Sequence, residues 1–448
     1  MQFKYKFKVL TLIASLLFFN AKIAFADIYN IEDRLSKLEI EEDLKYKSDY
    51  KKKIVFPSVK IGFIHEEIFN SLSKNDSTQN TKRDSRFFNR TKAIFNFGLS
   101  KEFSINSNLI IEPVNNDIRH VFGLLEYAKQ DTDIKNFDRH GLIAEELNLQ
   151  YKTRDLTLYF GKFNVNFGNG ANRSSKLYDN TWYGIGGTDM NFAYQVREKM
   201  GVKFDFKVTP DSMSTEETEE SSMILSDDAN IKFFTRVSGG LFKSDNTKLF
   251  TSSISRKNPL YYNTNAGSDS IFRSYFLSTD FVTHNQYFKN IVSLGHVSQS
   301  SKDYNLKTQN SYAISAQQTF YPAHLFKFGA FGEYAAVRNF DGIAGAHQSF
   351  VTGSFFLGYE GLNIAYVYNK FKGNNNTSPA TFYKSNQLAY KPFLNSAAES
   401  SELTFGYDFK AGFGFKIGRK NYSGLKYNSQ NLQNISANHI MCNYAINY

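Results

Sequence analysis

The residues that could carry catalytic or metal chemistry are few and widely separated along the chain. His65-Glu66-Glu67 begins like the helix of a zinc protease, but Phe69 stands where the second histidine is required. The sequence contains no Gly-x-Ser-x-Gly nucleophile motif and no phosphate-binding loop. The eight histidines are scattered, and a single cysteine, Cys442, excludes an intrachain disulfide. We therefore expect no enzyme, no metal site and no cofactor.

Charged side chains are instead distributed through segments in which apolar and polar residues alternate. Between Val202 and Val208, for example, the apolar residues alternate with Lys203, Asp205 and Lys207. If such a strand crosses a membrane, a lysine or arginine facing lipid near the midplane costs about 2–4 kcal/mol, so the charges should face the other side. This rule places the following side chains on a water-facing inner wall: the bases Lys60, Lys92, Lys152, Lys203, Lys207, Lys232, Arg236, Lys327 and Lys416, and the acids Glu146, Asp205, Glu333 and Asp408. The wall is thus predicted to be net positive.

The elements that position these charges are predicted most clearly between residues 145 and 208. Alternating residues from Leu147 to Tyr151 indicate a strand, 153–155 a polar turn, and 156–163 a returning strand. The glycine-rich stretch 164–190 is too long for an ordinary hairpin connection. We expect it to be followed by a strand from Phe192, a turn at 197–199 and another strand from Val202. Short turns on one side and long loops on the other are typical of outer-membrane barrels.

Similar alternating segments continue over most of the chain and predict its fold class. They lie near residues 55–63, 93–99, 231–241, 248–255, 275–282, 291–297, 312–320, 326–337, 349–359, 362–368, 403–409 and 413–417. The expected short links include 104–107 and 360–361, and the expected long polar links include 64–90, 210–230, 259–270, 298–310 and 373–385. The pattern predicts an all-β fold, a transmembrane antiparallel β-barrel of about 16–18 strands.

The N-terminal region differs from the barrel. Lysines precede a short apolar run from Val9 to Phe19, and Ala24-Phe25-Ala26 matches a cleavage site, so residues 1–26 are predicted to be a signal peptide. Ile28, Ile31, Leu35 and Leu38 have helical spacing, which predicts a short periplasmic helical or linker segment over 27–53. The barrel would then occupy residues 54–448.

Bulk composition supports this division. The mean hydropathy of −0.43 excludes a helical membrane bundle, whereas a barrel whose strands alternate between lipid and water is expected to have a low mean value. The formal net charge is +10, and part of it belongs to the signal peptide. The remaining bases form no clustered basic helix, so no nucleic-acid partner is expected.

Two motifs carry a resemblance to a known family. Tyr444, Ile446 and Tyr448 alternate at the C-terminus, and this strand with its terminal aromatic residue resembles the assembly signal of Gram-negative outer-membrane barrels. The run 159–168, Tyr-Phe-Gly-Lys-Phe-Asn-Val-Asn-Phe-Gly, is similar to the segment that leads into the inward-folded third loop of porin-like proteins. Tyr183-Gly184 and Gly187-Thr188-Asp189 resemble the far end of that loop. The resemblance implies that 164–190 is a constriction loop and places its charges, Arg173, Lys176, Asp179 and Asp189, near the narrowest point.

The resemblance implies an outer-membrane porin, a water-filled channel for passive diffusion of small hydrophilic solutes in a Gram-negative bacterium. The predicted excess of basic residues on the inner wall adds a weak anion preference. The alternative is a non-conducting surface barrel that serves as an adhesin or structural anchor through its long loops. The partners expected are outer-membrane lipid, lipopolysaccharide and the outer-membrane assembly machinery, and a homotrimer is left open.

Overall fold

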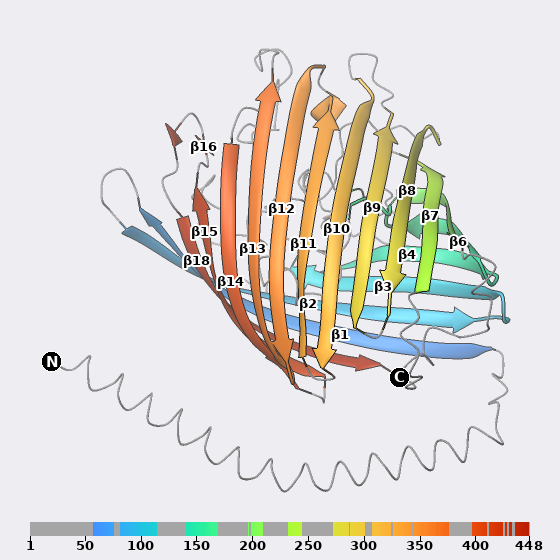
Figure 1. Cartoon of the computed structure of the whole chain (residues 1–448), viewed down its shortest axis with the longest axis horizontal. Coiled ribbons are helices and arrows are strands. Elements are labelled where there is room, and N and C mark those ends of the chain that lie inside the picture. The colour runs from blue at the N-terminus through green and yellow to red at the C-terminus, as the bar shows by residue number, and fades with distance from the viewer. Residues whose placement is uncertain are drawn as a thin grey trace, which may run out of the picture. The chain divides into compact units, whose positions relative to one another are not determined.

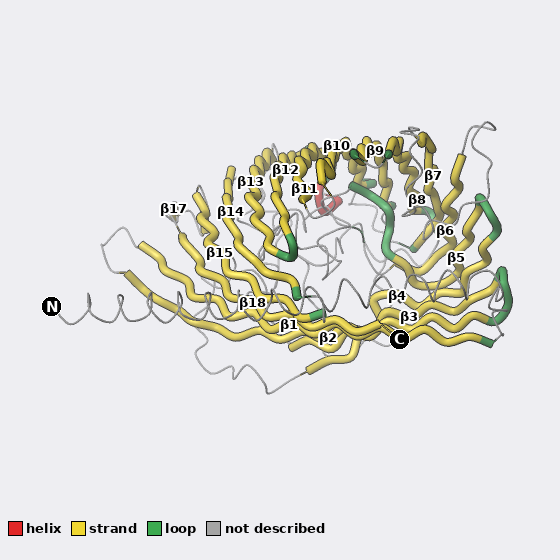
Figure 2. Tube along the Cα trace, turned by 60° about the horizontal axis from the view of Figure 1, so that its bottom comes forward, coloured by secondary structure: helices red, strands yellow, loops and turns green. Residues whose placement is uncertain are grey.

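The strands of the barrel lie side by side in one closed antiparallel sheet (Figures 1 and 2). The computed structural model describes residues 57–75, 81–113, 140–168, 196, 199–208, 232–243, 272–285, 287–300, 307–323, 326–342, 344–375, 397–409, 412–423, 426–427, 430–431 and 435–447. No helix in these ranges is both long and apolar enough to cross a membrane.

Sixteen strands of the described chain form the barrel, and each pairs with its neighbour in sequence until the last closes on the first. In chain order they are β1 (Ser58–Asn75), β2 (Thr81–Gly98), β3 (Phe103–Pro113), β4 (His140–Lys152), β5 (Leu156–Phe163), β6 (Lys199–Val208), β7 (Lys232–Phe242), β8 (Ser274–His284), β9 (Phe288–Gln299), β10 (Gln309–Ala323), β11 (Phe326–Arg338), β12 (Ala346–Tyr359), β13 (Leu362–Asn375), β14 (Ala397–Asp408), β15 (Phe413–Ser423) and β18 (Ile435–Asn447). A separate two-stranded sheet contains β16 (Lys426–Tyr427) and β17 (Gln430–Asn431), and one 3-10 turn, η4, spans Phe340–Gly342. The fold predicted from alternation is therefore confirmed.

The two faces of each strand have different environments, as the sequence alternation requires. Along β12, side chains alternate between buried and more accessible without interruption from Ala346 to Tyr359. The accessible side chains face outward and form an apolar outer surface around the barrel, with members that include Val59, Phe63, Phe97, Phe160, Val202, Phe206, Leu277, Leu294, Ile314, Phe355, Ile364, Phe405 and Ile417. A surface of this kind matches the hydrocarbon core of a membrane.

The first hairpin was not predicted correctly. The stretch 64–90 was expected to be a polar link, but it forms most of two long paired strands, β1 and β2, whose register runs from Ser58↔Gly98 to Asn75↔Thr81. Their distal halves are rich in polar residues, so hydrophobic alternation fades there although the backbone hydrogen bonds continue. Residues 104–107, expected to be a turn, lie within β3, and the turn itself covers 99–102.

A second correction concerns the segment before β6. The sequence suggested a strand from Phe192 and a turn at 197–199, but Lys199 is the first residue of β6, and β5 pairs directly with β6. Residues 191–195 and 197–198 lie outside the described residues. The long connection therefore runs from 164 to 198 without an intervening barrel strand among the described residues.

Connections at the two ends of the barrel differ in length. The turns 99–102, 153–155, 285–287, 360–361 and 409–412 join strand ends at the end where β1 begins and β18 finishes. Glu360 and Gly361 have φ values of 46° and 87°, the left-handed pair typical of a type I′ hairpin turn. The connection 209–231 is an exception, because the ends of β6 and β7 that it joins lie at this turn end.

Several sequence predictions fall outside the described residues. The chain divides into a unit of residues 1–56 and a unit of residues 57–448, and none of the first unit is described, so the signal peptide and the helical segment 27–53 stay predictions. The strand expected near 248–255 also lies outside. His65-Glu66-Glu67 lies within β1, which rules out the helix that a zinc-protease motif would need.

The C-terminal strand occupies the position where the barrel closes. β18 pairs with β15 on one side and with β1 on the other, and Phe63 lies opposite Ile446 in this register. Tyr444 faces outward and is 44% exposed. The side chain of Ile446 and the whole of Tyr448 are outside the described residues.

Candidate functional site

The chain leaves β5 toward the interior of the barrel. After Phe163, residues Asn164–Gly168, here called the entry segment, are described although they belong to no strand. Val165 and Phe167 are each only 1% exposed. The amide of Val165 donates to the carbonyl oxygen of Val196 at 3.1 Å, so the start and the end of the long connection meet each other.

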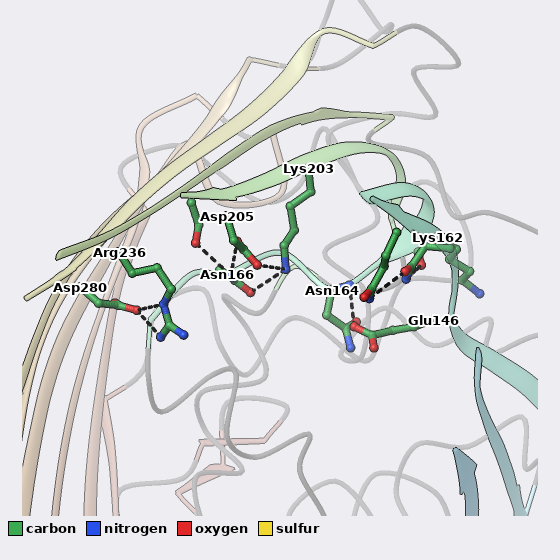
Figure 3. A network of polar contacts seen from close by, with 11 residues as sticks. Glu146, Lys162, Asn164, Asn166, Lys203, Asp205, Arg236 and Asp280 are labelled. Carbon is green, nitrogen blue, oxygen red and sulfur yellow. Dashed lines mark hydrogen bonds and ion pairs between the residues drawn. The ribbon is translucent and has the colours of Figure 1, made fainter. Parts of the chain in front are cut away.

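Polar contacts fix the entry segment to the inner wall (Figure 3). The backbone amide of Asn164 donates to Oε1 of Glu146 on β4 at 3.2 Å. The side-chain amide of Asn166 donates to Oδ1 of Asp205 and to Oγ of Ser238, each at 3.2 Å, and its oxygen accepts a bond from Lys203 Nζ at 3.3 Å. One asparagine is thus held by three side chains from β6 and β7.

The entry segment also lies close to strands farther around the wall. A Cβ atom on Gly295 of β9 would lie 3.1 Å from the ring of Phe167, so a glycine at this position leaves room for that ring. Gly168 has a φ of +66°, and a Cβ on it would lie 3.1 Å from a carboxylate oxygen of Glu333 on β11. The five residues therefore contact strands from β4 to β11.

A β-bulge brings two adjacent carboxylates to the same face of β4. The β3–β4 register shifts between Asn108, which lies opposite Glu146, and Leu109, which lies opposite Ala144. Glu145 is the extra residue, and a bulge of this kind re-aims a side chain. Lys92 on β2 donates to Glu145 Oε2 at 2.9 Å, and these side chains are 9% and 1% exposed. Glu146 accepts from Asn108 and from the backbone amide of Asn164.

Comparisons with known proteins bear on the fold alone. No protein-family model matches the sequence, and no curated protein matches it. Among solved structures, the chain is similar to Pseudomonas putida OprB, with a TM-score of 0.52 and 12% identity over 87% of this chain and 94% of that chain. The chain has a porin-like β-barrel fold. A second match is the outer membrane channel DcaP of Acinetobacter baumannii, with a TM-score of 0.48 and 12% identity over 89% of this chain and 99% of that chain. A third is an anion-selective porin from Comamonas acidovorans, with a TM-score of 0.46 and 9% identity over 87% of this chain and 99% of that chain.

Five of the thirteen charges predicted for the inner wall of this porin-like barrel lie on β6 and β7, and three of the five, Lys203, Asp205 and Arg236, form ion pairs. Lys203 Nζ lies 3.4 Å from Asp205 Oδ2 and 4.3 Å from the centre of the Tyr159 ring. Arg236 donates through Nε and Nη2 to Asp280 Oδ2 at 3.0 and 2.6 Å (Figure 3). The basic groups here are partly neutralised by acids on the same or the next strand.

The other predicted charges lie apart from this network. Lys207 Nζ lies 4.7 Å from the centre of the Phe234 ring, and Lys327 Nζ 5.9 Å from that of Phe356. Lys416 Nζ lies 4.0 Å from Asp408 Oδ1 near the turn end. The side chain of Lys232 is outside the described residues, and so are all four predicted constriction residues, Arg173, Lys176, Asp179 and Asp189.

Sequence reasoning missed several charges on the inner face. Asp280 occupies an inward position in an alternating segment and could have been found by counting residues from Tyr275. Lys199, Glu402 and Lys420 lie at strand positions beyond the segments recognised in the sequence, and each is at most 1% exposed. Glu145 had no sequence signal, because simple alternation from Glu146 points it outward. These additions are nearly balanced in charge, so an excess of basic residues persists among the described inward positions.

The inner wall from β9 to β13 has a different character. Its buried inward side chains combine apolar residues with many hydroxyls and amides, which include Ser293, Gln299, Gln309, Ser311, Ser315, Gln317, Thr319, Gln348, Thr352, Asn363 and Asn369. An apolar cluster of Phe331, Phe356, Ala365 and Val367 lies among them. Glu333, 4% exposed and next to Gly168, is a charged exception.

Proposed function

We propose that this protein is an outer-membrane porin, a water-filled channel through which small hydrophilic solutes diffuse passively, with no enzymatic step. The observation that carries the proposal is the entry segment, which turns inward after β5 and is fixed by polar and apolar contacts. A chain segment that crosses the interior of a closed barrel narrows it. Residues 164–190 would then form a constriction that includes Arg173, Lys176, Asp179 and Asp189.

The two faces of the barrel support the same proposal. An apolar outer surface favours insertion into a membrane, while an inner face of charges, hydroxyls and amides favours water. The porin-like fold is consistent with this use. Export by the predicted signal peptide would bring the chain to the outer membrane, and the alternating C-terminal residues Tyr444, Ile446 and Tyr448 would be read by the assembly machinery there.

We infer a weak preference for anions from the basic excess on the inner wall. A wall that carries mainly one sign of charge, in a channel of low dielectric constant, focuses its electric field along the channel axis. The pairs Lys203 with Asp205 and Arg236 with Asp280 cancel part of that field, so the preference should be small. Reversal potentials in a salt gradient measure it, and the preference should decline near 1 M salt, where the Debye length is about 3 Å.

Single-channel conductance in planar bilayers tests the pore and its constriction together. The mature protein should form open channels, and deletion of Ser174–Gly184 should raise their conductance because it shortens the chain inside the barrel. A matched control is a deletion of the same length, 378–388, from the connection between β13 and β14. An unchanged conductance in the first variant would mean that the deleted residues lie outside the narrowest part of the pore. A folded wild type that never conducts would favour a surface barrel that acts as an adhesin or anchor.

A further inference from the structure

A basic surface lies on the inner face of the barrel at the turn end of β6–β9. Lys207 Nζ on β6 lies 4.7 Å from the centre of the Phe234 ring on β7, and the ring of His284 on β8 lies 6.3 Å from the same ring, centroid to centroid. Arg236 lies directly opposite Lys207, and Lys289 on β9 lies directly opposite His284. We call this surface, Lys207, Phe234, Arg236, His284 and Lys289, the basic mouth.

The bases of the basic mouth can be reached from the barrel interior. Arg236 and Lys289 are exposed, while Lys207 and His284 are half-buried. Asp280 on β8 pairs with Arg236, whose Nη2 lies 2.6 Å from its Oδ2, and offsets that positive charge (Figure 3). The two lysines lie on the strands that flank this pair, so the mouth presents positive charge across four strands.

The connection that begins beside the basic mouth has the opposite charge. Residues 209–231, here called the acidic connection, contain no Lys, Arg or His. β6 ends at Val208 and β7 begins at Lys232, so both ends of the acidic connection lie at the turn end, next to the basic mouth. Its carboxylates are those of Asp211, Glu216, Glu217, Glu219, Glu220, Asp227 and Asp228.

The acidic connection is much longer than the distance between its ends requires. β6 and β7 are hydrogen-bonded neighbours, and two to five residues usually join such strands. Lys289, the farthest base of the mouth, lies three strands from β6, about 15 Å at the usual strand spacing. Glu216 follows Val208 by eight residues, and an extended chain of that length spans about 26 Å. The carboxylates can therefore reach every base of the basic mouth.

Two physical effects favour contact between the acidic connection and the basic mouth. Charges at the opening of a low-dielectric channel focus their field, so they attract a counter-ion more strongly than charges on an open surface do. The covalent tether also keeps the carboxylates at a high effective concentration beside the bases. A dissolved anion must compete with both effects.

We propose that the acidic connection, 209–231, docks on the basic mouth and serves as its intramolecular counter-ion, with carboxylates in contact with Lys207 and Lys289. The docking requires only the closed barrel. Its effect on ions rests on the proposed pore: the docked carboxylates offset the bases at one opening and so weaken the anion preference of the channel.

Zero-length cross-linking with a carbodiimide tests the docking independently of conduction. In the mature protein in detergent micelles, Lys207 and Lys289 should form amide bonds with carboxylates of the acidic connection, identified by mass spectrometry. Lys101 is the matched control, because it is exposed at the same end of the barrel, in the turn before β3, three strands from β6 in the other direction. Lys289 should couple about fivefold more often than Lys101.

Two outcomes of the cross-linking would overturn the proposal. Equal coupling of Lys101 and Lys289 would show that the acidic connection has no preferred contact within its reach. Coupling mainly between two chains, measured with a mixture of isotope-labelled and unlabelled protein, would make a second copy the occupant of the basic mouth.

Proteolysis gives a second readout of the same contact. A glutamate-specific protease should cleave within 216–220 about fivefold faster in Lys207→Gln/Lys289→Gln than in the wild type, because two charged contacts are lost and cleavage follows the undocked population. Lys207→Arg/Lys289→Arg keeps both charges and should be cleaved at the wild-type rate, as should the charge-matched control Lys60→Gln/Lys101→Gln. Equal rates in all these variants would count against docking.

Reversal potentials in a salt gradient measure the consequence for ions. Replacement of the four glutamates of 216–220 by glutamine should shift the potential toward anion preference at low ionic strength, and the shift should vanish near 1 M salt, where the Debye length is about 3 Å. An unchanged potential, or a shift toward cation preference, would overturn the counter-ion role. If the wild type does not conduct, the proposed pore fails, while cross-linking and proteolysis still decide the docking.

Discussion

The inner walls formed by β4–β8 and by β9–β13 line the same barrel but are built from different side chains. The first holds Glu146, Lys203, Asp205, Arg236 and Asp280, most of them in contact with one another or with the entry segment. The second consists mainly of hydroxyls, amides and apolar side chains. Charges are therefore concentrated where the chain crosses into the barrel, which indicates that they position the entry segment.

The two walls should also differ in how much stability a single substitution removes. Removal of one partner from a buried ion pair leaves an uncompensated charge, whereas removal of one hydroxyl leaves only an unmade hydrogen bond. The charged wall should thus be sensitive to single substitutions and the uncharged wall tolerant of them. Four variants test this contrast, in order of decreasing expected effect.

The largest effect is expected from Glu145→Gln in the charged wall. This change keeps the shape of the side chain but removes the negative charge that is paired with the buried ammonium of Lys92. The free energy of unfolding should fall by about 3–5 kcal/mol. Urea titration of the protein in lipid vesicles measures it. The double variant Lys92→Met/Glu145→Gln should regain most of the loss, and a loss that persists in the double variant would mean that the pair does not act as a unit.

A smaller effect is expected from Asn166→Ala in the entry segment. It removes the contacts with Asp205, Ser238 and Lys203, at a cost of about 1–3 kcal/mol to the local attachment. Open-channel current noise should increase because the segment is held less firmly. The matched control is Gln317→Ala on the uncharged wall, where the side-chain oxygen has no hydrogen-bond partner among the described residues. Similar noise in both variants would show that the contacts of Asn166 do not hold the constriction.

Thr352→Val should have a still smaller effect on the uncharged wall. The hydroxyl of Thr352 donates to Oδ1 of Asn369 at 3.1 Å, and Asn369 keeps its bond to Ser400 in the variant. The expected loss is about 1 kcal/mol of unfolding free energy in the same urea titration. A loss as large as that of Glu145→Gln would remove the proposed energetic contrast between the walls.

The smallest effect is expected from Arg236→Gln on ion selectivity. The variant removes a positive charge and frees Asp280, so the reversal potential in a salt gradient should move toward cation preference. Because Arg236 is half exposed and screened, the change should correspond to less than about 1 kcal/mol. Lys370→Gln on the outer face is the matched control and should leave the potential unchanged. An equal shift in both variants would show that the sign of the inner wall does not set selectivity.

Much of the barrel was predictable because the side-chain period of a strand is two. Alternation alone identified the positions of most strands and the inward direction of Lys203, Asp205 and Arg236. It failed in the polar halves of β1 and β2, where long strands carry too few apolar residues to show the pattern. It also failed for 104–107, whose serines and asparagines suggested a turn although their backbone belongs to β3.

The sequence by itself determined the class of fold, the faces of the strands and the place of the long connection after the fifth strand, because these depend on local periodicity and spacing. The tertiary structure decided what no local pattern records. A bulge turned Glu145 inward to meet Lys92, fifty-three residues away in the chain. Closure of the barrel brought Asn166 to Ser238 and Gly168 to Glu333. Such contacts depend on which strands become neighbours across the interior, and that is fixed only when the sheet closes.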